Sequence, residues 1–215
     1  MKFSLVIFFY VIINYTYAQN YIDSVLFKNA FIPNKIDTNG LKQGLWKETL
    51  SEEKFSHMIV SYYNNVKNGQ FRVYYKNDGI AMEGFFKNNS LDSIHREYYP
   101  RGTLKKINHY LDGFLNDEQI EYWENTNIKS KTYYVDGKLN GIYTAYYKTG
   151  GKWIEYKVIN GVSEGYYKHY YKNGQIWYDG QKLNDKKEGK WIEYDIHGNI
   201  IKIYFYERGK LTQEK

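Results

Sequence analysis

The sequence predicts an all-β protein, an elongated single-layer twisted antiparallel sheet of tandem β-hairpin repeats, each about 24 residues long and stacked like a solenoid. Tyrosine recurs at steps of 24 residues. Each interval holds two short runs of aromatic and β-branched residues separated by pairs such as Asn-Gly and Asp-Gly, which is the pattern of a β-hairpin. The tyrosine column consists of Tyr74, Tyr98, Tyr122, Tyr146, Tyr170 and Tyr194.

Three more columns follow the same spacing and hold glycine or another turn-compatible residue. The first is Gly69, Ser93, Asp117, Gly141, Gly165 and Gly189; the second is Gly102, Thr126, Gly150, Gly174 and Gly198; the third is Gly113, Gly137, Gly161, Asp185 and Gly209. Asparagine, aspartate and glycine tolerate positive φ. We therefore expect tight turns at these columns, including Asn68-Gly69 and Asn140-Gly141, and also at Asp179-Gly180.

The composition favours a thin sheet over a globule with an aliphatic core. The 215 residues include 26 tyrosines, and 20% of all residues are aromatic, so tyrosine supplies much of the apolar bulk. No cysteine is present, so no disulfide links the strands. The net charge of +6 comes from lysines interleaved with acidic residues, without a run of five basic residues, and we expect no nucleic acid partner.

Four segments are expected along the chain. Residues 1–18 have the pattern of a signal peptide, with an apolar run from Phe3 to Ile13 and a cleavage site near Ala18. We expect export to the periplasm, the cell envelope or the medium, with an uncleaved anchor as the alternative. Residues 19–38 are expected to form a leader or cap, residues 39–209 a repeat domain of about six full hairpins plus one partial hairpin, and residues 210–215 a frayed end.

The repeat unit resembles a known family. The segment Asn140-Gly-Ile-Tyr-Thr-Ala-Tyr-Tyr-Lys-Thr-Gly150, followed by Tyr156 and Asn160-Gly161, is similar to the bacterial variant of the MORN repeat, the membrane occupation and recognition nexus. The resemblance covers about residues 39–209. It implies one open sheet of successive hairpins that associates with proteins or membranes, and similar bacterial proteins are often labelled antitoxin components. The family motif contains no catalytic residue.

The middle copies depart from this pattern. Ser93 and Asp117 occupy the first glycine column, His95 is a further departure, and Gln119 fills a position that is aromatic in other copies. We expect the sheet to bend there or to present a different surface.

No constellation of residues indicates catalysis or metal binding. The five histidines show no recognised metal-ligand spacing. Glu97 and Glu121 share a repeat column, and we interpret them as acids on a solvated sheet face rather than as a catalytic pair. We therefore expect a non-enzymatic protein that needs no cofactor.

The leading hypothesis is a protein-binding or scaffold module that uses an aromatic-rich face of the sheet, because tyrosine is enriched at interface hot spots. The candidate partner-binding residues, expected to share one face, are Tyr143, Tyr147, Tyr167 and Tyr171. A first alternative is peripheral binding to an anionic membrane surface. Its candidate contact residues are Lys148, Lys152, Lys168 and Lys172. A second alternative is an antitoxin-type or immunity-type role, in which the chain neutralises a toxic protein.

Overall fold

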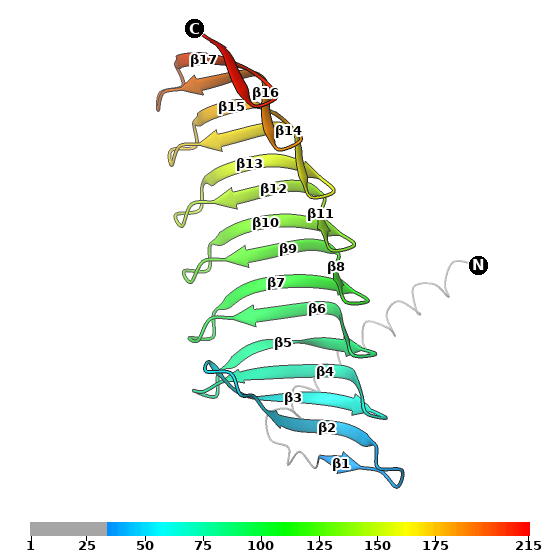
Figure 1. The fold of residues 1–215 in the computed structure, drawn as a ribbon. Helices are drawn as coiled ribbons and strands as arrows, with labels where there is room; N and C mark the ends of the chain where they lie inside the picture. The colour runs from blue at the N-terminus through cyan, green and yellow to red at the C-terminus, as the bar shows by residue number, and fades with distance from the viewer. Residues whose placement is uncertain (1–33) are drawn as a thin grey trace, which may run out of the picture. The chain divides into compact units, whose positions relative to one another are not determined.

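The computed structural model describes residues 34–215, and their regular secondary structure is entirely β. Strands pair antiparallel into one open sheet, which confirms the single-layer hairpin architecture expected from the repeats (Figure 1). This part of the chain contains no helix long and apolar enough to cross a bilayer. The expected signal peptide and the leader up to residue 33 lie outside the described residues.

Strands that follow one another in the chain are also neighbours in the sheet. They are β1 (Lys35–Ile36), β2 (Lys42–Thr49), β3 (Phe55–Tyr63), β4 (Val66–Tyr75), β5 (Ile80–Lys87), β6 (Ser90–Tyr98), β7 (Leu104–Leu111), β8 (Phe114–Leu115), β9 (Asp117–Tyr122), β10 (Ile128–Val135), β11 (Lys138–Leu139), β12 (Gly141–Tyr146), β13 (Lys152–Ile159), β14 (Val162–Tyr170), β15 (Ile176–Leu183), β16 (Lys186–Tyr194), β17 (Ile200–Glu207) and β18 (Lys210–Glu214). β8 and β9 both pair with β7 and are separated at Asn116, and β11 and β12 both pair with β10 and are separated at Asn140.

Each repeat contains two kinds of turn, and both coincide with columns expected from the sequence. On one side of the stack, two-residue turns have both residues at positive φ, as at Asn64-Asn65 (50° and 66°) and Asp136-Gly137 (48° and 76°). Positive φ at both positions is the signature of the type I′ turn, whose twist matches that of the flanking strands. On the other side, longer loops reach positive φ at residues such as Gly102 and Gly150, which belong to the second column.

The first glycine column does not form turns, so this expectation was wrong. Gly69 and Gly165 lie inside β4 and β14 at φ values of 111° and 97°, where the register with the preceding strand shifts. These positions are β-bulges, and Ser93 (60°) and Asp117 (83°) adopt the same positive φ. Asp179-Gly180, also expected as a turn, lies within β15. Bulges of this kind and primed turns favour the same residues because both have positive φ.

Hydrogen bonds join each hairpin to the next along both sides of the stack. On the side of the longer loops, an aromatic side chain donates to the backbone carbonyl 23 residues ahead. The pairs are Tyr75 with Tyr98 (2.6 Å), Tyr99 with Tyr122 (2.8 Å), Trp123 with Tyr146 (3.3 Å), Tyr147 with Tyr170 (2.7 Å) and Tyr171 with Tyr194 (2.9 Å). On the side of the type I′ turns, backbone N–H groups donate to carbonyl groups of the preceding hairpin. Examples are Gly113 to Leu91, Gly137 to Leu115 and Gly161 to Leu139.

A terminal strand pairs antiparallel with its neighbour at each end of the sheet. At the first end, β1 pairs with β2 and belongs to the expected leader region 19–38. At the other end, the sequence predicts that residues 210–215 fray, yet Lys210–Glu214 forms β18 and pairs with β17. Lys215 also exchanges two backbone hydrogen bonds with Ile203, at 2.9 and 2.8 Å. Backbone pairing thus holds this exposed segment, although most of its side chains are polar.

The hydrogen bonds between hairpins predict a specific loss of stability. Replacing Tyr147 with phenylalanine removes the hydroxyl that donates to the Tyr170 carbonyl and keeps the ring. We expect the free energy of unfolding to fall by about 1 kcal/mol, measured by urea unfolding followed by circular dichroism. Tyr63→Phe is the matched control, because Tyr63 is 63% exposed, and should change stability by less than about 0.5 kcal/mol. Equal losses in both variants would contradict the structural role of the Tyr147 hydroxyl.

Candidate functional site

One face of the sheet, here called the aromatic face, carries a row of rings across β12–β17. The row consists of Tyr143, Tyr156, Tyr167, Trp191 and Tyr206. Successive ring centroids lie 4.9, 5.8, 5.2 and 6.2 Å apart. Cross-strand aromatic pairs of this kind contribute about 0.2–1 kcal/mol each. Residues 34–215 form a single layer, so no other element of the described chain covers this row.

A glycine on the neighbouring strand holds Trp191 in the row. Trp191 is only 2% exposed, and a Cβ atom at Gly180 would lie 2.3 Å from its indole ring. The indole N–H donates to the backbone carbonyl of Gln181 at 3.0 Å. The missing side chain at Gly180 therefore lets the indole lie against the backbone of β15.

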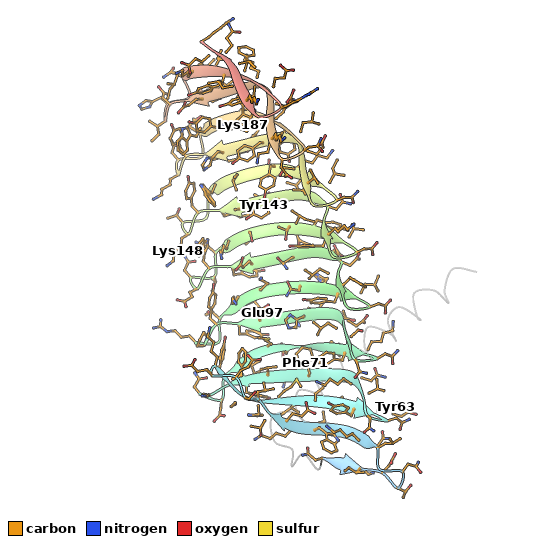
Figure 2. All side chains as sticks on the ribbon, in the orientation of Figure 1. Tyr63, Phe71, Glu97, Tyr143, Lys148 and Lys187 are labelled. Atoms are coloured by element: carbon orange, nitrogen blue, oxygen red, sulfur yellow. The ribbon has the colours of Figure 1, made fainter. Side chains whose placement is uncertain are left out.

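The four tyrosines predicted to bind a partner divide into two pairs. Tyr143 and Tyr167 lie in the row of rings, and Tyr143 lies over the strands in Figure 2. Tyr147 and Tyr171 lie at the loop ends, pack against tryptophan rings at 6.5 and 5.4 Å, and donate their hydroxyl groups to the next hairpin. Burial raises the pKa of Tyr143, Tyr147 and Tyr167 above the ordinary tyrosine value. The hydroxyl groups of Tyr147 and Tyr171 thus stabilise the stack of hairpins.

The four lysines predicted to contact a membrane lie away from the aromatic face. Lys148 and Lys172 are exposed in loops, and Figure 2 shows Lys148 beside the stack. Lys152 and Lys168 lie on the opposite face, where Glu155 forms an ion pair with Lys152 and stands opposite Lys168 in register. The predicted tyrosine and lysine sites therefore do not form one surface.

Polar side chains occupy the middle repeats on the same side of the sheet as the row of rings. Asn108 Nδ2 lies 3.2 Å from His95 Nδ1, and the Gln119 amide donates to Asn108 Oδ1 at 2.6 Å. Thr132 is paired with Gln119 in register and is 6% exposed, and its hydroxyl has no hydrogen-bond partner within residues 34–215. His95 and Gln119 were departures from the repeat pattern, so the middle repeats do present a different surface.

An exposed aliphatic row was missed by the sequence analysis. It is formed by the residue before the type I′ turn in four consecutive repeats. These residues are Leu111 (53% exposed), Val135 (39%), Ile159 (40%) and Leu183 (45%). Their recurrence at steps of 24 residues was a signal that could have identified them. Exposed apolar surface of this kind is common where proteins interact.

Lysines neutralise Glu97 and Glu121, the two acids that share a repeat column. Glu97 pairs with Lys105 at 3.2 Å, and Glu121 pairs with Lys129 at 3.0 Å. Across the described residues, histidine, aspartate and glutamate side chains nowhere gather in threes as a potential metal site.

Compared with known proteins, the chain matches no protein-family model and no curated protein. The similarity to the MORN repeat therefore rests on the residue pattern of the repeat unit.

Trp191 and Gly180 provide a test of the row of rings. Gly180→Ala should displace the indole, because the added methyl group would overlap it, and should lower the free energy of unfolding by roughly 1–3 kcal/mol. Tryptophan fluorescence and urea unfolding measure the two effects. Gly151→Ala is the control, because its Cβ would meet only the Lys172 carbonyl at 3.7 Å. If both variants behave alike, Trp191 does not lie against Gly180.

Buried His95 predicts a pH dependence of stability. Burial lowers its pKa from 6.5, so the unfolded chain binds more protons than the folded chain between the lowered pKa and 6.5. Stability should therefore fall as the pH drops below about 6.5. His95→Gln should flatten the slope of unfolding free energy between about pH 7 and 5, by up to about 1.4 kcal/mol per pH unit. His197 is exposed, so His197→Gln is the control. An unchanged slope in His95→Gln would refute the contribution of His95 to the pH dependence of stability.

Proposed function

We propose that this chain is an exported, non-enzymatic repeat protein that binds another protein through its aromatic face, as a binding or scaffold module. The row formed by Tyr143, Tyr156 and Tyr167 carries the proposal, because it is continuous, half-buried and uncovered by the described part of the chain. Tyrosine provides a large contact area with few rotatable bonds. Export rests on the sequence pattern of residues 1–18.

The hydroxyl groups of this row support a binding role. Tyr147 and Tyr171 use their hydroxyls to join hairpins. The hydroxyls of Tyr143, Tyr156 and Tyr167, by contrast, form no hydrogen bond within residues 34–215. They can therefore bond to a partner without breaking an internal contact. The surrounding sheet fixes the rings before binding, which limits the entropy lost on association.

The alternatives receive less support. Membrane binding would use Lys152 and Lys168, which share their face with the carboxylate of Glu155, together with two lysines in separate loops. An antitoxin or immunity role is a special case of protein binding, in which the bound protein is toxic and the complex is one to one. This role would also require the aromatic face to bind a protein.

The test is capture of a partner with matched tyrosine variants. The chain is immobilised and exposed to crosslinked envelope and medium of the cells that produce it, and captured proteins are quantified by mass spectrometry. Tyr143→Ser/Tyr167→Ser should reduce recovery of a stoichiometric protein at least about tenfold, because two central contacts are lost. Tyr133→Ser/Tyr166→Ser changes the opposite face and should retain recovery.

Circular dichroism and thermal unfolding must first show that both double variants remain folded. Equal recovery by the two folded variants would exclude the aromatic face as the binding surface. Failure of the unsubstituted chain to capture any stoichiometric protein would reject the proposed function.

A further inference from the structure

A hollow of about 280 Å³ lies at the C-terminal end of the aromatic face, across β14, β15 and β16. It is lined by Tyr167, His169, Tyr178, Lys182, Lys187 and Trp191. Small-molecule sites usually measure about 300–1,000 Å³, so this hollow lies at the lower end of that range and has room for a single side chain. Its walls are aromatic and basic, and none of the six residues is acidic.

Two lysines of the hollow stand opposite each other on neighbouring strands. Lys182 and Lys187 are directly opposite in the register of β15 and β16, a placement in which like charges are destabilising. Neither forms an ion pair among the described residues. The Asp185 carboxylate interacts with Lys182 only at longer range, and it accepts a hydrogen bond from the backbone N–H of Ser163 at 2.8 Å. The Lys182 ammonium lies 4.8 Å from the Tyr167 ring centre, and that of Lys187 lies 4.5 Å from Trp191. These cation–π contacts position the charges without neutralising them.

The first hairpin contains a similar arrangement with a carboxylate in place. β2 and β16 share the pattern Lys-x-Gly-x-Trp-x-Glu, with Lys42 corresponding to Lys187 and Glu48 to Glu193. The Lys42 ammonium lies 4.4 Å from the Trp46 ring centre. The Glu48 carboxylate lies 3.1 Å from the nitrogen of Lys42 and 3.8 Å from that of Lys67. The chain itself thus shows that a carboxylate fits between two lysines when one of them lies over a tryptophan ring.

Glu193 does not supply this carboxylate at the hollow. It accepts hydrogen bonds from the Tyr204 hydroxyl at 2.7 Å and from the Trp177 indole at 3.4 Å. The bond from Tyr204 is the main cause that lowers the pKa of Glu193, and it raises the pKa of Tyr204 to about 12. Glu193 also accepts a hydrogen bond from Tyr178, which lines the hollow, and it forms no ion pair with either lysine.

His169, which lines the hollow, carries an unsatisfied polar atom. Its Nε2 atom is buried and has no hydrogen-bond partner within the described residues. Burial lowers the pKa of His169, so the ring is neutral at pH 7 and adds no third positive charge. The hollow therefore combines two cations, aromatic walls and one neutral polar ring.

We propose that this hollow anchors an acidic side chain of the partner protein, a glutamate or aspartate whose carboxylate lies between the ammonium groups of Lys182 and Lys187. The inference rests on the proposed protein-binding function and specifies the chemistry of the partner. The carboxylate accepts charge-assisted hydrogen bonds from both lysines and relieves their mutual repulsion. The rings of Tyr167 and Trp191 shield the contact from water, as at interface hot spots.

The first experiment is an NMR titration of the isotope-labelled full chain with N-acetyl-glutamate N-methylamide. The uncharged glutamine analogue and inorganic phosphate serve as comparison probes. We expect the glutamate probe to shift amide signals of β14–β16, and the glutamine analogue to leave them unchanged. Lys182→Gln/Lys187→Gln should weaken the glutamate effect at least about tenfold, because both charged donors are lost. Lys148→Gln/Lys172→Gln makes the same change in net charge at exposed loops and should bind as the unsubstituted chain does.

Each other outcome would overturn the proposal. Equal shifts with the glutamine analogue would show that charge is not recognised, and shifts by phosphate alone would assign the hollow to a phosphate-bearing ligand such as a lipid headgroup. Shifts that persist in folded Lys182→Gln/Lys187→Gln would place the site elsewhere. Capture separates this inference from the proposed function, because a partner retained by Lys182→Gln/Lys187→Gln sustains protein binding but rejects the acidic anchor.

Discussion

The hydrogen bonds between successive hairpins are the constraint on which the rest of the structure depends. A single layer of short strands cannot bury a large aliphatic core, and an isolated hairpin is marginally stable in water. Here, side chains such as Tyr147 bond to the next hairpin on one side of the stack, and type I′ turns bond to the preceding hairpin on the other. Because the Tyr147 bond spans 23 residues, a change in repeat length would break it. The fixed length keeps equivalent side chains on the same face.

This constraint divides the tyrosines into two classes. Tyr147 and Tyr171 stand at the loop ends, and their hydroxyls hold neighbouring hairpins together. Tyr143 and Tyr167 lie within strands, where their rings stack across the sheet and their hydroxyls make no bond inside the described chain. One residue type therefore stabilises the stack and also supplies the surface proposed to bind a partner.

The same face of the sheet changes character along its length. Near its beginning, Glu48 neutralises Lys42, and a small core forms around Val60. The middle carries the hydrogen-bonded side chains around Asn108. The last third carries stacked rings, and Lys187 lies over one of them, opposite a second lysine. A partner that contacts both aromatic rings and positive charge would therefore bind the last third of this face.

The sequence by itself determined the period, the all-β class and two of the three turn columns, because turn chemistry and strand patterns are local properties. It did not distinguish turns from bulges at Gly69 and Gly165, since both need positive φ. Hairpin pairing implies that Lys182 and Lys187 stand opposite each other. Only the tertiary structure decided that neither lysine forms an ion pair, because that outcome depends on which of several nearby donors the Glu193 carboxylate meets.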